Sequence, residues 1–238
     1  MEFDTVWQQL EAWGSESVRR SNAKAGAGEN QFGVMMGKLR GLAAQLQKEH
    51  APAHALALRL WETGNADAML LATMLMDPAL VDEAVLEAMM RPLTYTRLVD
   101  ELAYNVVARS PHAATLRKRW MDAPEEYVGR AGWQVAIAAL TDPKAVKAAR
   151  RTEDGLPHAL NLDGLLEKIE AEVLQAPLHK QESMTQCLAM IATHYDAYTQ
   201  QCLALGEKLG RYDTRPVPKG CTAWYAPEWI AAVLARRK

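Results

Sequence analysis

The sequence predicts an all-α fold built from short antiparallel helix pairs. Alanine and leucine are abundant, runs of β-branched residues are absent, and aromatic residues make up only 7% of the chain. A capping residue followed by proline recurs at Asp77-Pro78, Ser110-Pro111 and Asp142-Pro143. At such a start the capping oxygen accepts from the first amides, and proline at the first helical position loses no hydrogen bond. These marks divide the chain into helices joined by short connections.

The helices follow one another with little chain between them. In order, the predicted helices are 4–13, 15–24, 35–48, 53–63, 65–76, 80–91, 94–109, 111–122, 124–141, 162–175, 179–194, 196–209 and 225–237. At Gly64-Asn65, glycine closes one helix and asparagine opens the next. Short joins make consecutive helices antiparallel, which allows either a globular bundle or a stacked solenoid. Periodicity leaves both packings open.

Longer connections divide a single predicted domain, 1–238. It comprises an N-terminal helical pair (1–24), a glycine-rich ordered loop (25–34), helical repeats (35–210) and a proline-rich crossing with a terminal helix (211–238). The polar stretch 150–161 joins two helices at length.

Charge and composition limit the class of protein. The net charge of −2 and the pI of about 6.3 argue against a protein that coats nucleic acid by charge excess. Basic groups such as Arg117-Lys118-Arg119 are typical of solvated helix faces, although they allow a local basic surface. No apolar run approaches the roughly 20 residues that span a bilayer, and the N-terminus is not typical of a secretory signal. Cys187, Cys202 and Cys221 have no metal-like spacing, so we expect reduced thiols in a cytoplasmic protein.

Two helices carry polar residues in their central turns. In the helix 94–109, Thr96, Asp100 and Tyr104 share one face, and Asp100 lies too deep for a capping role. In the helix 124–141, Tyr127, Arg130 and Gln134 share a face. Asp100 could be an ordinary exposed aspartate or an ion-pair partner of Arg97, and Arg130 could bind a phosphate or form an intramolecular salt bridge. In a solenoid, alternate helices line one surface, which would place Asp100 and Arg130 on one concave wall.

Several segments resemble a known family. They are NQFGVMMGKLRGLA (30–43), ALALRLWETGNADAMLLATMLMDP (55–78), YTRLVDE (95–101), EEYVGRAGWQVA (125–136) and MTQCLAMIATHY (184–195). Over roughly residues 30–210 the chain resembles the AlkD-type DNA alkylation repair proteins, and the first and fourth segments are the most specific. The resemblance implies a solenoid of HEAT-like repeats with a concave cationic face that binds duplex DNA. It also implies excision of cationic alkylated purines such as 3-methyladenine and 7-methylguanine.

Position by position, the family's aspartate, which stabilises an oxocarbenium-like sugar, matches Asp100, and its backbone-binding arginine matches Arg130. The family's two tryptophans do not carry over, because one position holds Thr96, beside Tyr95, and the other holds Gln186. Loss of both aromatic walls weakens the positioning of the sugar.

Three hypotheses follow. The first is an alkylpurine DNA glycosylase, in which Asp100 is catalytic and the DNA is contacted by Arg130, Tyr127, Tyr95, Thr96, Gln186, Lys38 and Arg40. The second is a DNA-binding protein of the same fold, including binding to branched DNA, without bond cleavage. The third is a helical-repeat scaffold for protein partners. We expect a monomer that binds double-stranded DNA, alkylated or structured, with no cofactor, no metal and no membrane contact.

Overall fold

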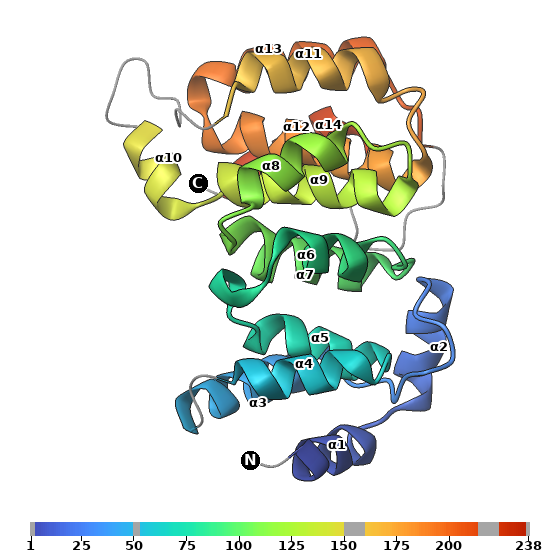
Figure 1. The fold of residues 1–238 in the computed structure, drawn as a ribbon. Helices are drawn as coiled ribbons and strands as arrows, with labels where there is room; N and C mark the ends of the chain where they lie inside the picture. Colours follow the sequence, from blue (N-terminus) through green and yellow to red (C-terminus); the bar gives the residue numbers. More distant parts are fainter. Residues whose placement is uncertain (1–2, 50–52, 150–159, 214–223, 237–238) are drawn as a thin grey trace. The chain divides into compact units, whose positions relative to one another are not determined.

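The computed structural model describes residues 3–49, 53–149, 160–213 and 224–236, and every regular element within them is helical (Figure 1). The all-α prediction is therefore confirmed. The chain divides into two compact units, Met1–Leu116 and Arg117–Lys238. A single domain over 1–238 stays a prediction, and each unit is described by itself.

Unit 1 contains seven described α-helices and part of an eighth. These are α1 (Phe3–Ala12), α2 (Glu16–Lys24), α3 (Met36–Glu49), α4 (His54–Glu62), α5 (Ala66–Leu75), α6 (Glu83–Met90), α7 (Thr96–Asn105) and the first turn of α8 (Ala113–Met121). Two 3-10 turns, η1 (Pro78–Leu80) and η2 (Val107–Arg109), follow α5 and α7.

α5 is the central helix of unit 1. Its sequence, ADAMLLATML, is mostly apolar and nearly all of its residues are buried, as is typical of a helix surrounded by others. It packs against α3, α4 and α7, and Leu70 and Leu71 are buried in that core. Asn65 caps it by accepting from the amides of Asp67 and Ala68, and Gly64 before it has φ +63°. The predicted Gly64-Asn65 boundary is therefore confirmed.

The glycine-rich loop 25–34 is fastened to α5 by one carboxylate. Asp67 is fully buried and accepts from the backbone amides of Phe32, Gly33 and Val34 at 2.7, 2.8 and 2.9 Å. Gly33 has φ +81°, and a Cβ built there would lie 2.4 Å from the carbonyl oxygen of Ser15. Only glycine fits this crossing of loop and helix start. The loop is thus a built part of unit 1.

Unit 2 holds the rest of α8 and six further α-helices in the described residues. These are α9 (Glu126–Leu140), α10 (Pro143–Ala149), α11 (Leu162–Glu172), α12 (Leu178–His194), α13 (Thr199–Leu209) and α14 (Ala226–Ala235), with the 3-10 turn η3 (Asp196–Tyr198) before α13.

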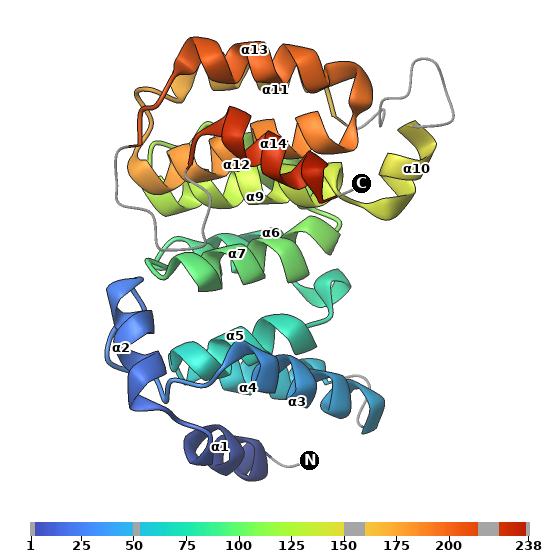
Figure 2. The ribbon, with the colours of Figure 1, turned by 180° about the vertical axis from the view of Figure 1, so that it is seen from behind.

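α12 is the central helix of unit 2. It contacts α9, α11, α13 and α14, and most of its residues are buried. Figure 2 shows α14, in red, lying in front of α12, with α11 and α13 above them, and α14 contacts both α12 and α13. Ile230 of α14 is fully buried, and Pro227 packs directly on Gly206 of α13. The terminal helix is therefore an integral part of the core of unit 2.

α8 and α9 approach each other closely within unit 2. A Cβ built on Gly132 would lie 2.3 Å from the backbone nitrogen of Met121. Trp120 and Trp133 are fully buried beside this crossing. Both tryptophans are thus core residues.

The structure differs from the predicted boundaries in three ways. α10 was not among the predicted helices, although Asp142-Pro143 marks its start. The long predicted helix 94–109 ends at Asn105 and continues as the 3-10 turn η2. Asp77 caps the 3-10 turn η1, accepting from the amide of Ala79, rather than the start of α6. Cys221 and most of the predicted connection 150–161 lie outside the described residues.

Candidate nucleic-acid interface

α7 carries the predicted catalytic aspartate in its central turns. Leu98 and Leu102 are buried on one face, whereas Thr96 and Asp100 are half-buried and Tyr104 is 49% exposed on another. The predicted division of this helix into two faces is confirmed. Asp100 therefore lies on the outward face of α7 without being a fully solvated side chain.

Next to Asp100, a charged side chain links α7 to α3. Arg40 of α3 donates to Glu101 of α7 at 3.2 Å, across the central helix α5. The other oxygen of Glu101 accepts from Asn105 at 2.8 Å, and Asn105 also donates to the hydroxyl of Thr73 in α5 at 3.4 Å. Three neighbouring helices are tied together by this polar network.

The two predicted DNA-contact residues on α3 are both exposed. Lys38 extends its ammonium over the ring of Trp13, 5.5 Å from the ring centre. Arg40 has a side chain that is 65% exposed although it pairs with Glu101. Both positive charges are therefore available at the surface of unit 1.

Tyr95 is placed inside unit 1 rather than on its surface. It precedes α7, is 4% exposed, and lines a hollow of about 280 Å³ together with Leu70 and Arg97. Its hydroxyl has no hydrogen-bond partner of normal geometry among the described residues. Burial raises the pKa of Tyr95, and the charge of Arg97 opposes this rise. Direct contact of this ring with DNA would require the start of α7 to move.

Arg130 forms an intramolecular salt bridge in unit 2. It is 6% exposed, donates to Glu182 of α12 at 2.7 Å and donates to the carbonyl oxygen of His179 at 3.1 Å. Of the two roles that the sequence left open for Arg130, the structure displays the salt bridge. Its predicted contact with a DNA phosphate stays a prediction, and it would compete with this pair.

Tyr127 and His179 extend the same cluster. Their rings stack with centres 5.2 Å apart, and the Nδ1 atom of His179 lies 3.2 Å from Glu182. The His179 amide donates to Glu126 at 2.8 Å. Burial raises the pKa of Tyr127, and Glu126 adds to the rise. Tyr127 therefore joins the starts of α9 and α12, with part of its ring still accessible.

Gln186 is bound to the neighbouring inner residue of α9. It accepts from Gln134 at 2.9 Å, and Gln134 is itself 8% exposed. The preceding residue, Thr185, is hydrogen-bonded to the hydroxyl of Tyr212 from the segment that leads to α14. A polar pair therefore stands where the resemblance places a tryptophan.

The sequence predicts the candidate site residues but not the residues that they contact. No local sequence pattern predicts the contacts of Glu182, Glu101 and Arg109. Glu182 and Glu101 pair with residues on other helices, and Arg109 lines a groove formed by several helices. Glu182 pairs with a residue 52 positions away. The one indication in the sequence is the central position of Arg130 in its predicted helix, because a buried guanidinium needs a carboxylate beside it.

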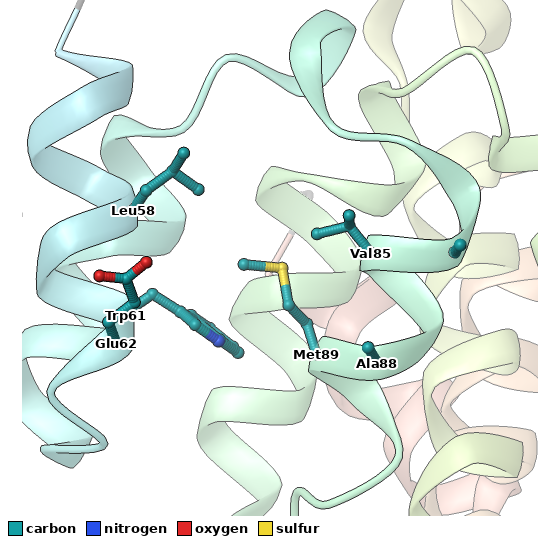
Figure 3. Close-up of a pocket in the computed structure, with 7 residues that line it drawn as sticks. Leu58, Trp61, Glu62, Val85, Ala88 and Met89 are labelled. Atoms are coloured by element: carbon teal, nitrogen blue, oxygen red, sulfur yellow. The ribbon is translucent and has the colours of Figure 1, made fainter.

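A second hollow in unit 1 has a different character. It lies between α4 and α6, has a volume of about 410 Å³, and is lined by Leu58, Trp61, Val85 and Met89, with Glu62 as its one charged residue (Figure 3). In Figure 3 the ring of Trp61 extends toward the sulfur of Met89. An apolar lining with a carboxylate does not suit a phosphate backbone.

The described helices include none that is both long and apolar enough to cross a membrane. The same residues contain no group of three or more histidine, cysteine, aspartate or glutamate side chains arranged to hold a metal ion.

Short helices packed around a central helix in each unit define an all-helical protein of the helical-repeat class. More narrowly, the chain belongs to the family described as DNA alkylation repair enzyme, which it matches over residues 6–208. The suspected family is therefore confirmed. No functionally curated protein matches the sequence.

A solved structure supports the same fold. It has a TM-score of 0.80 to this chain at 24% sequence identity, and the match covers 100% of this chain and 95% of that one. It is described as belonging to a new family of proteins related to the HEAT-like repeat DNA glycosylases with affinity for branched DNA structures. At this identity the likeness shows the fold, and the HEAT-like prediction is confirmed.

Proposed function

We propose that this protein binds branched DNA and does not excise bases. The observation that carries the proposal is the engagement of Arg130 and Gln186 within unit 2. Arg130 is buried against Glu182, and Gln186 is hydrogen-bonded to Gln134. These are the positions at which the family resemblance would put a backbone-binding arginine and a tryptophan wall for the sugar.

Three further observations support DNA binding without excision. Thr96, at the other tryptophan position, has a short side chain that offers no aromatic surface to a deoxyribose. The solved structure with the same fold is described by its affinity for branched DNA. Lys38 and Arg40 are exposed and supply positive charge for phosphate contacts despite the chain's net charge of −2.

The test is a comparison of DNA substrates with purified protein. A four-way junction and a linear duplex that contains the same arm sequences are titrated at several salt concentrations. We expect the junction to bind at least about tenfold more tightly, with an affinity that falls as salt rises. Equal affinities would contradict the preference for branches, and the absence of salt-dependent binding would contradict DNA binding itself.

A second candidate is slow, Asp100-dependent excision of cationic alkylated purines. It is favoured by the half-buried position of Asp100 in the middle of α7, where a carboxylate can stabilise developing positive charge on a sugar. Release of 7-methylguanine from methylated duplex DNA by wild-type protein, lost in Asp100→Asn, would establish this activity. Release that persists in Asp100→Asn would exclude Asp100 from it.

A further inference from the structure

The groove above the C-terminal half of α5 differs from the other hollows of unit 1 in its polar, cationic lining. It has a volume of about 300 Å³, and its residues come from α3, α5 with the residue after it, η1, α7 and η2. Arg40, Gln47, Thr73, Asn105 and Arg109 supply its polar groups. Because α3 and α7 both pack on α5, they form the two walls, and α5 forms the floor.

Positive charge dominates this groove. Arg40 and Arg109 both line it, and both are exposed. The nearby carboxylate, Glu101, has a side chain that is only 17% exposed and is covered by Arg40 and Asn105. The contact that the described residues give the Arg109 guanidinium is the ring of Tyr104, at 5.5 Å from its centre. One half-buried negative charge, already paired with Arg40, therefore lies near two exposed positive charges.

Hydrogen-bond donors remain for a ligand. A guanidinium has five N–H donors, and Arg40 uses one nitrogen to bind Glu101. Gln47 donates to the carbonyl oxygen of Met74 at 2.6 Å, which holds its carboxamide at the edge of the groove. The contact with Glu101 holds the Arg40 side chain across the groove between α3 and α7, so Glu101 is a positioning residue. Each guanidinium can bind the oxygens of a phosphate group, a pairing that arginine favours.

The size and rim of the groove suit a nucleotide backbone. The volume of about 300 Å³ equals about ten water volumes, which is more than one phosphate needs. Tyr104 is 49% exposed beside Arg109, so an aromatic surface borders the cationic groove. An aromatic ring next to a guanidinium can pack on a deoxyribose or a base while the cation holds the phosphate.

We propose that this groove binds a DNA backbone phosphate through Arg40 and Arg109, with Tyr104 packing against the adjoining nucleotide. The proposal rests on the proposed DNA-binding function and adds the place where one strand is held in unit 1. Arg109 and Tyr104 thereby gain a role that the sequence pattern did not assign.

The test is the double variant Arg40→Gln/Arg109→Gln, titrated with four-way junction DNA. We expect its affinity to fall at least about tenfold and the slope of log affinity against log salt to decrease by about two, one for each arginine. The matched control is Arg59→Gln/Arg91→Gln, which removes two exposed arginines of unit 1 that do not line the groove. Control binding should stay within about twofold of wild type. Thermal unfolding of both variants checks that the fold is kept.

A double variant that is folded and binds like wild type, with an unchanged salt slope, would overturn the groove proposal and leave DNA binding intact. If the wild-type protein does not bind DNA, a titration with inorganic phosphate tests whether the groove is an anion site. We then follow the Nε–H resonances of Arg40 and Arg109 by NMR during a phosphate titration. Saturable shifts of these two resonances, with those of Arg59 and Arg91 unchanged, support an anion site for free phosphate, and unchanged Arg40 and Arg109 resonances overturn the site.

Discussion

Asp67 is the buried charge on which the first loop depends. Its carboxylate accepts three backbone amides. In Asp67→Asn, one acceptor oxygen becomes an amide that faces backbone donors, so buried N–H groups lose their partner. We expect the free energy of unfolding to fall by about 2–3 kcal/mol, measured by urea denaturation.

The matched control is Asp82→Asn, since Asp82 is exposed and its side chain makes no capping hydrogen bond at the start of α6. Its loss should stay below about 0.5 kcal/mol. Equal losses in the two variants would show that Asp67 does not hold the loop.

The contribution of the Arg130–Glu182 pair to the free energy of unfolding can be measured. Its side chains are 7% and 10% exposed, so Glu182→Gln removes a buried negative charge that lies 2.7 Å from the guanidinium of Arg130. We expect a loss of about 3 kcal/mol in stability. In the exposed pair of Lys208 and Glu170, the variant Glu170→Gln should cost less than about 1 kcal/mol.

The same pair also yields a double-mutant cycle. Arg130→Met/Glu182→Leu removes both charges, so its loss should be much smaller than the sum of the two single losses. Additive losses would mean that the two side chains do not act as a pair, and Arg130 would then be a stronger candidate for a DNA contact.

At the scale of the element, the space around a glycine distinguishes a close helix crossing from an open helix surface. At Gly132 an added Cβ would meet the backbone of Met121 at 2.3 Å, whereas at Gly41 in α3 no atom of the described residues lies within 4 Å of it. Gly132→Ala should therefore force α8 and α9 apart and cost about 1–3 kcal/mol. Gly41→Ala should raise stability by about 0.5–1 kcal/mol, because alanine is the better helix former. Thermal melts of the two variants that shift in the same direction would contradict this distinction.

Helices and their faces were predictable because periodicity and caps are local. The buried Leu98–Leu102 face of α7 and the Asn65 cap of α5 follow directly from spacing. α10 was missed because seven residues with two lysines resemble a loop. The partners of Arg130 and Arg40 could not be predicted, since each pairs with a carboxylate more than 50 residues away and only packing brings them together.

At the scale of the whole molecule, the buried thiols lower the free energy of unfolding as the pH becomes alkaline. Burial raises the pKa of Cys202 from 9.0 to about 12, and burial also raises the pKa of Cys187. In the unfolded chain these thiols lose their protons first. Between pH 9 and about 12 the folded state binds more protons, so stability is complete below pH 9 and falls as pH rises through that window.

Thiol labelling checks the same property at neutral pH. In a Cys221→Ser background, both remaining cysteines are buried, so a thiol reagent should react with them only as the protein unfolds. The labelling rate should rise with urea in step with unfolding. Rapid labelling of the folded protein would show that the core of unit 2 opens locally.

The three amides held by Asp67 belong to a loop, yet their hydrogen bonds end on a fully buried carboxylate. Backbone hydrogens in connecting segments ordinarily exchange with solvent deuterium within the first moments. Those of Gly33 and Val34 should exchange as slowly as hydrogens in the middle of α5, because releasing them requires the loop to separate from that helix. In a deuterium-uptake map, protection would therefore extend across a stretch that contains no regular secondary structure.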